Sequence, residues 1–224
     1  MTATPTGQAI AAMLWEAGAI RVSAQQPFIL AAGWASPVYI DCRLLIGEPA
    51  WRSRTASLAA DFIREKFPAN SFDAIAGAET SGVPFAVWVA DILGLKLRYV
   101  RKRSLGTGHN AQVEGGSVKG LRVLLMDDLT TDGGSKLAFM RGLEAAGAKV
   151  EHVLTIFHHD AFPGAQDRLA KTGLSLWALA TWADLLAVDH GQTSDKDREE
   201  IMRFLADPVA WSTRHGGRSS PVAR

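Results

Sequence analysis

Residues 122–136 read Arg-Val-Leu-Leu-Met-Asp-Asp-Leu-Thr-Thr-Asp-Gly-Gly-Ser-Lys, and this stretch decides the fold. Its apolar start predicts a buried strand, which runs into two adjacent acids and a turn rich in hydroxyls and glycine. A helix is expected from near Ser135 to Gly147, so free N–H groups in its first turn would attract a phosphate. Gly133 and Gly134 let the backbone curl closely around that anion. The stretch therefore has the outline of a binding site.

The adjacent acids Asp127 and Asp128 stand where this strand is expected to end, at the rim of an open α/β sheet where ligands bind. Carboxylates repel phosphate, so the acids must serve another part of the same ligand. Vicinal sugar hydroxyls, or a metal carried with the ligand, are the natural partners. The stretch thus predicts a cradle for ribose 5-phosphate. The alternative is an ordinary strand–helix junction with an acid pair at its N-cap, although such a junction seldom needs two acids and two glycines.

Four apolar residues, two acids and Leu-Thr-Thr-Asp-Gly-Gly-Ser, over residues 123–135, resemble the phosphoribosyl diphosphate signature of the type I phosphoribosyltransferases. With three further segments, the Thr-Thr-Asp-Gly-Gly form is similar to the orotate phosphoribosyltransferases. The resemblance covers roughly residues 20–160 and implies that residues 130–135 grip the 5′-phosphate. The residues that it implies in phosphoribosyl diphosphate binding are Thr80, Ser81, Arg101, Lys102, Asp127, Asp128, Leu129, Thr130, Thr131, Asp132, Gly133, Gly134 and Ser135.

Length and composition are those of a globular protein. A chain of 224 residues fits one ordinary α/β domain with additions, and 47% hydrophobic with 21% charged residues allows a full core. The net charge of +1 excludes a global field that would recruit nucleic acid or an anionic membrane. Cys42 is the only cysteine, which excludes an internal disulfide and fits a reducing compartment.

A cytoplasmic location is expected from the apolar segments of the chain. The first apolar run has no basic segment before it and is interrupted by Trp15 and Glu16, unlike a secretory signal. The longest apolar stretch, residues 82–95, contains Asp91 and is too short to cross a bilayer. We therefore expect no membrane and no nucleic acid among the partners.

The N-terminal part, residues 1–45, predicts a helix over 7–18, a short strand over 19–22 and a hairpin over 28–41 with its turn at 33–37. The sequence of residues 28–41 resembles the N-terminal hood segment of orotate phosphoribosyltransferases, which covers the pyrimidine in that family. Tyr39 and Ile40 would offer the base a flat apolar face. Many family members have a lysine where this chain has Ala31, so recognition of the orotate carboxylate would fall to backbone amides or another cation. A plain hairpin that packs an aromatic cluster is the alternative.

A second strand, turn and helix follow a long helix predicted over residues 49–67. A strand over 72–77 leads into Thr80, Ser81 and Gly82, and a helix then runs to Leu93. Hydroxyls and a glycine at a helix start suit a diphosphate, and in the resembled family this loop holds the pyrophosphate. Some members carry a lysine where Ser81 stands, and the alternative reading is that these residues only cap the helix.

The basic run Arg101-Lys102-Arg103 follows a strand predicted over residues 97–100 and precedes a glycine-rich segment, 104–116, without helical or strand period. Such a segment is typical of a mobile loop. The resemblance implies that it is the catalytic loop of a homodimer, with the loop over 101–116 reaching the neighbouring site. Related sequences carry a further lysine where Leu105 lies, which leaves Lys102, Arg103 and His109 as its substitutes. A solvated charged face is the alternative.

The rest of the chain predicts a strand over 149–157, a helix over 164–172, a strand over 176–179 and helices over 182–190 and 194–205. Adjacent strand residues point to opposite faces, so His158 and His159 would make a poor metal chelate. We expect loop or base-pocket roles for them. The tail, residues 214–224, is expected to be disordered.

The sequence as a whole predicts an α/β fold with a mostly parallel central sheet, helices on both faces and an N-terminal hood. Its expected organisation is one compact unit, with helix and hood over 1–45, the core with closing helices over 46–213 and the tail over 214–224. The resemblance implies transfer of ribose 5-phosphate from phosphoribosyl diphosphate to orotate. It also implies that the substrate carries Mg²⁺ into the site and that no side chain binds the ion directly. Any contact of the ion with Asp127 and Asp128 would pass through a water molecule. The alternatives are a purine or uracil phosphoribosyltransferase and a regulator that binds phosphoribosyl diphosphate without turnover. The implied catalytic residues are Lys102, Arg103, His109, Asp127 and Asp128, and the implied orotate contacts are Tyr39, Ile40, Thr131 and His159.

Overall fold

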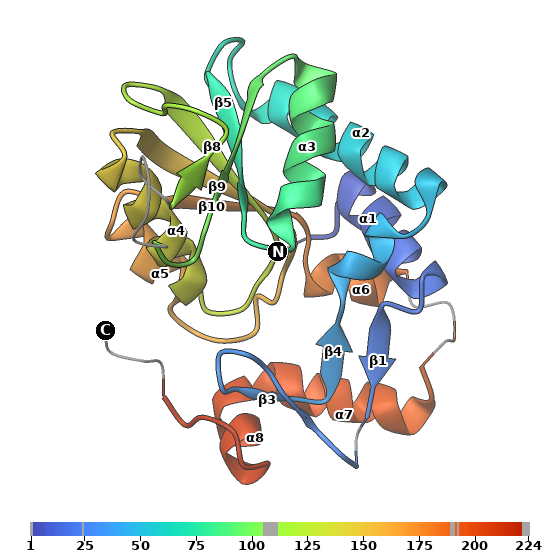
Figure 1. Ribbon diagram of the computed structural model, residues 1–224. Coiled ribbons are helices and arrows are strands. Elements are labelled where there is room, and N and C mark those ends of the chain that lie inside the picture. The colour runs from blue at the N-terminus through green and yellow to red at the C-terminus, as the bar shows by residue number, and fades with distance from the viewer. Residues whose placement is uncertain (1, 24, 105–111, 189–190, 192, 221–224) are drawn as a thin grey trace.

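The computed structural model describes residues 2–23, 25–104, 112–188, 191 and 193–220. At its centre is a six-stranded sheet with the order β10-β9-β8-β5-β6-β7 (Figure 1). All neighbouring strands pair in parallel except β6 and β7, which are antiparallel. This sheet confirms the prediction of a mostly parallel α/β fold. Its strands are β5 (Ala74–Ala78), β6 (Lys96–Val100), β7 (Val113–Glu114), β8 (Arg122–Thr130), β9 (Lys149–His158) and β10 (Ser175–Ala180).

Helices cover both faces of this sheet, as predicted (Figure 1). One face packs against α1 (Pro5–Glu16), α2 (Pro49–Lys66) and α3 (Gly82–Leu93), and the other against α4 (Gly134–Ala145) and α5 (Ala165–Ala170). The central strand β8 serves both cores because successive side chains point to opposite faces. Leu124 and Met126 belong to the first core, whereas Val123 and Leu125 belong to the second.

Close contact between α3 and β8 brings two turns of the sheet rim together. A Cβ on Gly82, the first residue of α3, would lie 2.4 Å from the backbone oxygen of Met126. No side chain fits there, so glycine is required by packing rather than by conformation. The loop before α3 and the end of β8 consequently lie side by side, as a shared ligand site requires.

The hood is built from two small antiparallel sheets. β1 (Ile20–Val22) pairs with β4 (Val38–Ile40), and β2 (Phe28–Ile29) pairs with β3 (Ala35–Ser36). The hairpin expected over residues 28–41 is therefore only partly correct, because β4 leaves it to join β1. A 3₁₀ helix, η1 (Cys42–Ile46), then leads into α2.

The last three helices of the described residues lie beside the hood (Figure 1). They are α6 (Trp182–Ala187), α7 (Asp195–Ala206) and α8 (Pro208–Arg214). The sequence did not predict α8. Residues 214–220 also depart from the disorder expected of the tail, because the chain after α8 hydrogen-bonds to the hood, with the N–H of Arg218 donating to the oxygen of Gly33 at 2.9 Å. Residues 221–224 lie outside the described residues.

Two further boundaries differ from those expected. β8 continues to Thr130, so Asp127 and Asp128 lie within the strand and not after its end. β7 forms at residues 113–114, inside the segment that lacks a strand period, because its two residues pair with Tyr99 and Val100 of β6. The remainder of that segment, residues 105–111 with His109, lies outside the described residues.

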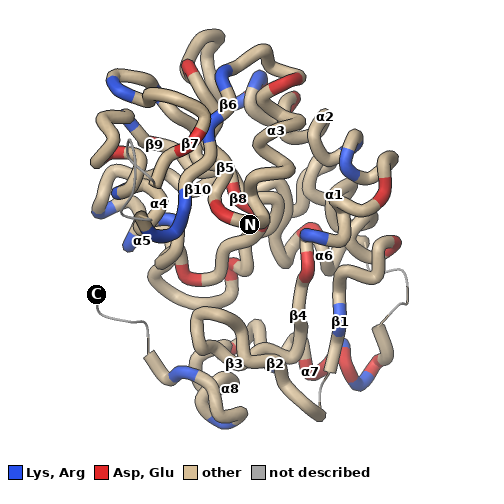
Figure 2. Tube along the Cα trace, viewed as in Figure 1, with Lys and Arg blue, Asp and Glu red and all other residues tan. Residues whose placement is uncertain are grey.

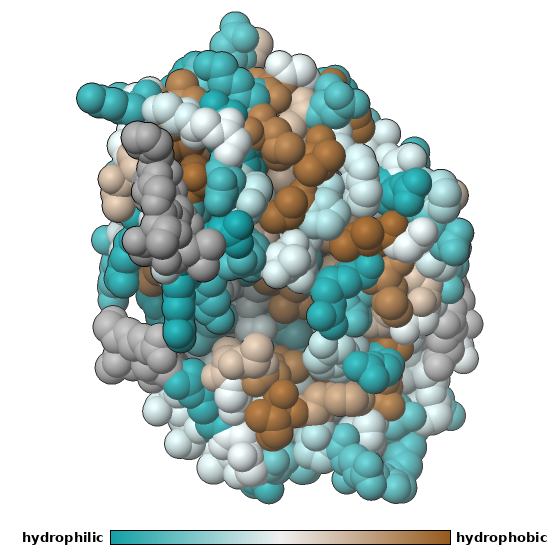
Figure 3. Space-filling model, viewed as in Figure 1, coloured by the Kyte–Doolittle hydropathy of each residue, from teal (hydrophilic) through white to brown (hydrophobic). Residues whose placement is uncertain are grey.

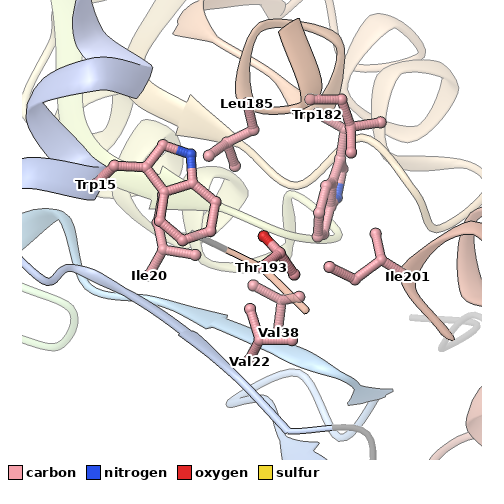
Figure 4. Close-up of a pocket in the computed structure, with 9 residues that line it drawn as sticks. Trp15, Ile20, Val22, Val38, Trp182, Leu185, Thr193 and Ile201 are labelled. Carbon is pink, nitrogen blue, oxygen red and sulfur yellow. The ribbon is translucent and has the colours of Figure 1, made fainter. Parts of the chain in front are cut away.

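A small apolar pocket lies between α1, the hood and the closing helices (Figure 4). Its walls include Trp15, Val38, Trp182 and Ile201, and its volume of about 10 Å³ holds at most one water molecule. It is a packing void and not a substrate site. Among the helices of the described residues, none has both the length and the apolar character needed to span a membrane.

Candidate functional site

A cleft of about 550 Å³ lies between the hood and the rim of the sheet at the end of β8. The space-filling view shows this face hollowed between the core and the hood (Figure 3). Basic and acidic residues are interspersed over the whole trace, so no single-signed field covers the molecule (Figure 2). The lining residues are Ala31, Ala32, Gly33, Lys102, Leu129, Thr130, Thr131, Asp132, Gly134, Ser135, Ala138, Arg168 and Arg218.

The turn between β8 and α4 provides one wall of the cleft. Gly133 has φ +75°, a left-handed conformation that favours glycine, and a Cβ there would also lie 3.0 Å from Leu169. Asp132 closes the turn by accepting a hydrogen bond from the N–H of Gly134 at 3.1 Å. The first turn of α4 then faces the cleft through Gly134 and Ser135. This is the arrangement of backbone groups and hydroxyls that suits a phosphate.

A buried ion pair joins the start of α4 to β8. The ammonium of Lys136 donates to the carboxylate of Asp127, to the backbone oxygen of Leu129 at 2.7 Å and to Ser135 Oγ at 3.2 Å. Three acceptors satisfy the three N–H bonds of an ammonium group. The side chains of Lys136 and Asp127 are only 2% and 9% exposed, so the pair belongs to the interior beneath the rim.

The two acids of the strand therefore differ in their surroundings. Asp127 is held by Lys136 and also accepts a hydrogen bond from the N–H of Asp128 at 2.9 Å. Asp128 is the less buried acid and lacks a cation within hydrogen-bond distance in the described part of the chain. Burial, and next the negative charge of Asp127, raise the pKa of Asp128 to about 7 from an ordinary 3.8. The carboxyl of Asp128 thus changes charge near neutral pH.

Glu79, at the end of β5, organises the basic segment after β6. Its carboxylate accepts from Arg101 Nη1 at 3.2 Å and from the backbone N–H of Lys102 at 2.9 Å. Arg101 is further engaged by Glu114 at 3.4 Å, whereas Lys102 lines the cleft and Arg103 is exposed. Of the three cations, Lys102 is thus the one that the structure places at the cleft.

Thr80 and Ser81 occupy the turn that the sequence placed before α3. Ser81 is the N-cap residue of α3, but its side chain makes no capping hydrogen bond. Neither residue lines the cleft. The tight packing of Gly82 on β8 nevertheless holds this turn beside Asp127.

Of the residues predicted for the base, Thr131 lines the cleft and three others do not. Tyr39 is engaged elsewhere: Arg21 lies over its ring at 4.7 Å, and Arg43 donates to its hydroxyl at 3.3 Å. Ile40 is buried in the core. His159 is buried too, accepts from Trp182 Nε1 at 3.3 Å, and has its pKa lowered to about 3 by burial and then by His158.

Sequence reasoning missed four residues that shape the cleft: Glu79, Lys136, Arg168 and Arg218. A signal existed for Lys136, because it holds the first place of the helical stripe continued by Phe139, Met140 and Leu143. A lysine in a buried stripe requires an acid partner. No local pattern points to Arg168 or Arg218, which approach Asp132 at 3.5 Å and 3.7 Å from other parts of the chain.

The donor set of the cleft fits an ion carried on a substrate better than one held by the protein. Within the described ranges, no three or more His, Cys, Asp or Glu side chains are grouped as metal ligands. The two oxygens of Asp127 accept from Lys136 and from the N–H of Asp128, and neither Asp127 nor Asp128 lines the cleft, where Asp132 is the single acid among the described residues. Mg²⁺ prefers to keep several waters and to bind through few carboxylates and substrate phosphates.

Comparison with known proteins gives the family. The family described as phosphoribosyl transferase domain matches residues 48–183, more than half of the chain. The orotate phosphoribosyltransferase of Rhizobium rhizogenes is 46% identical over 210 residues, which cover 93% of this chain and 90% of that protein. That of Sinorhizobium fredii is 44% identical over 223 residues, with 99% and 96% covered. The crystal structure of orotate phosphoribosyltransferase from Aeropyrum pernix has a TM-score of 0.65 at 32% identity and covers 80% of this chain and 96% of that one.

Replacing Lys136 by Met is expected to destabilise the fold strongly, because the change leaves Asp127 as an unpaired buried charge. Breaking a buried pair from one side lowers the free energy of unfolding by about 3–5 kcal/mol. The double variant Lys136→Met/Asp127→Leu should recover much of this loss, since no buried charge remains. Urea unfolding measures the free energy of unfolding of the wild type, of Lys136→Met and of the double variant. Lys66→Ala is the control, because its pair with Glu65 is exposed and should matter little. A Lys136→Met effect no larger than this control would contradict the buried pair.

Asp128 is expected to make stability depend on pH. A carboxyl whose pKa is raised by folding contributes stability that is full below pH 3.8 and is lost as the pH rises through about 7. Asn at this position stays neutral, so the free energy of unfolding of Asp128→Asn relative to the wild type should rise across that interval. Urea unfolding of both proteins at a series of pH values measures the difference. A difference that is constant with pH would show that Asp128 titrates in its ordinary range.

Proposed function

The chain belongs to the orotate phosphoribosyltransferases, and we propose that the cleft under its hood is where ribose 5-phosphate passes from phosphoribosyl diphosphate to orotate. The products are orotidine 5′-monophosphate and pyrophosphate, and the reaction is a step of pyrimidine (UMP) biosynthesis. The observation that carries the proposal is that the hood and the turn after β8 line one cleft. A base held by one wall and a sugar phosphate held by the other would meet there. The family favours this pentosyltransferase reaction over a purine or uracil enzyme and over a regulator without turnover.

The sugar phosphate is assigned to the turn after β8. Hydroxyls and N–H groups of residues 130–135 grip the 5′-phosphate, and Leu129 lines the adjoining wall. Asp128 is assigned to the ribose hydroxyls, because it is the acid not engaged by Lys136. The predicted role of Asp127 at the ribose is proposed to act from beneath the rim, because Asp127 does not line the cleft, and its charge would favour the cationic sugar. Thr131, which also lines the cleft, is assigned to the base.

Bond cleavage at C1 builds positive charge on the ribose and negative charge on the diphosphate, so no nucleophilic side chain is required. Lys102 lines the cleft and is assigned to neutralise the leaving group, with Arg101 and Arg103 adding positive charge. Thr80 and Ser81 are assigned to the diphosphate from the turn before α3. Mg²⁺ carried on diphosphate and ribose oxygens supplies further charge neutralisation when it is bound. His109 lies outside the described residues, and its catalytic role stays a prediction.

The hood, within residues 1–45, is assigned to the base. Its residues 31–33 line the cleft, whereas Tyr39, Ile40 and His159 do not. Contact of these three residues with orotate stays a prediction. The proposed assembly is a homodimer in which the loop over 101–116 reaches the neighbouring site and excludes water. The proposed location is the cytoplasm.

Pyrophosphate release tests the proposed function directly. The protein is incubated with phosphoribosyl diphosphate, Mg²⁺ and orotate, uracil, adenine or hypoxanthine in turn. Release with orotate and not with the other bases is the expected result. Release with a purine or uracil would identify another base, and binding of phosphoribosyl diphosphate without release would identify a regulator.

Lys102→Ala is expected to lower turnover by about a hundredfold to a thousandfold, the usual effect of removing one group that stabilises charge in the transition state. Lys96→Ala is the matched control, because Lys96 begins β6, at the end of that strand opposite to the segment that carries Lys102. Steady-state pyrophosphate release measures both variants at saturating substrate. Equal and mild losses of turnover in the two variants would show that Lys102 takes no part in catalysis.

A further inference from the structure

The chain after α8 is anchored to the hood by close backbone packing. The N–H of Ala35 donates to Ser212 Oγ at 3.0 Å, and the N–H of Gly217 donates to the backbone oxygen of Ser212 at 2.8 Å. A Cβ on Gly217 would lie 2.3 Å from the nitrogen of Ala35, so only glycine allows this approach. The next N–H, that of Arg218, donates to Gly33 at 2.9 Å. We call residues 215–218 the strap, since they hold the C-terminal segment against β3.

The strap carries the guanidinium of Arg218 into the cleft. Its Nη1 donates to the backbone oxygen of Ala32 at 2.7 Å and lies 3.7 Å from a carboxylate oxygen of Asp132. The side chain is 30% exposed, and it forms no further hydrogen bond with the described residues. Most of the N–H groups of this guanidinium are therefore available to a ligand between the hood and the turn after β8.

The positive charge of the residues that line the cleft favours an anionic ligand. Among the described residues that line it, Asp132 is the single acid, against the cations Lys102, Arg168 and Arg218. Asp132 is close to both arginines, so it balances one of them and leaves a positive excess. The proposed substrates bring anionic groups to two ends of this space, a phosphate on the ribose and a carboxylate on the base.

The two arginines come from different walls of the cleft, although both approach the same carboxylate oxygen of Asp132, Arg168 at 3.5 Å and Arg218 at 3.7 Å. Arg168 comes from α5, which packs beneath the phosphate turn, where Leu169 lies against Gly133. Arg218 instead lies against the hood, at the backbone of Ala32 and Gly33 and next to Ala31. The hood is the wall assigned to the base, and the planar fork of an arginine pairs with a carboxylate through two parallel hydrogen bonds.

Resting on the proposed function, we propose that Arg218 is the specificity-determining residue that binds the carboxylate of orotate. The strap places it there from the far end of the chain. Discrimination between bases with and without a carboxylate would then depend on a residue outside the matched family domain, residues 48–183.

Equilibrium binding of two nucleotides isolates this contact. Orotidine 5′-monophosphate and uridine 5′-monophosphate differ only in the carboxylate on the base, so their affinity ratio reports its recognition. Arg218→Ala should weaken binding of orotidine 5′-monophosphate by about tenfold to a hundredfold, the range for a hydrogen bond between charged groups, and leave uridine 5′-monophosphate unchanged. Arg218→Lys, which keeps the charge without the fork, should fall between wild type and Arg218→Ala.

Arg168→Ala is the matched control, because an arginine at the phosphate turn should affect both nucleotides alike. An equal loss of both nucleotides in Arg218→Ala would place Arg218 on the phosphate or in a structural role and overturn the inference. Unchanged binding of both would overturn it as well. Wild-type protein that releases pyrophosphate with orotate, together with an unaltered affinity ratio in Arg218→Ala, would refute the inference alone. A wild type without orotate-dependent release would refute the proposed function itself.

Discussion

A buried ammonium group at the start of α4 is the interaction on which the cleft depends. Lys136 reaches back from the first turn of the helix and bonds Asp127 and the backbone of Leu129, both in β8. These bonds join the helix to the strand across the turn that carries Thr131 to Ser135. Opening the turn would separate Lys136 from Asp127 and leave an unpaired charge in the interior. Its backbone is consequently preorganised before any ligand arrives.

This ion pair also makes two neighbouring acids differ in their electrostatic surroundings. Asp127 is committed to Lys136 and is almost wholly buried, whereas Asp128 is the less buried acid of the rim. Burial, and next the negative charge of Asp127, raise the pKa of Asp128, so Asp128 holds its proton more tightly than usual. The strand thus combines a structural charge with a titratable one, from two identical and adjacent residues.

The cleft gathers charge from segments that are distant in the chain. Asp132 lies between Arg168 of α5 and Arg218 of the strap, while Lys102 enters from the end of β6. Glu79 fixes the backbone at Lys102, so the basic segment is held at its root. With the hood docked on α8, the N-terminal and C-terminal ends of the protein build one wall together.

The sequence by itself determined the alternation of strands and helices and the turn over residues 130–135, because apolar periodicity and glycine placement are local properties. It also identified the acid pair, although β8 runs past both acids. Only the tertiary structure decided that Tyr39 packs under Arg21 instead of facing the cleft. It alone decided that Arg218 meets Asp132. The physical reason is that such contacts join residues far apart in the chain, and their geometry follows from how whole elements pack, which no local pattern of residues encodes.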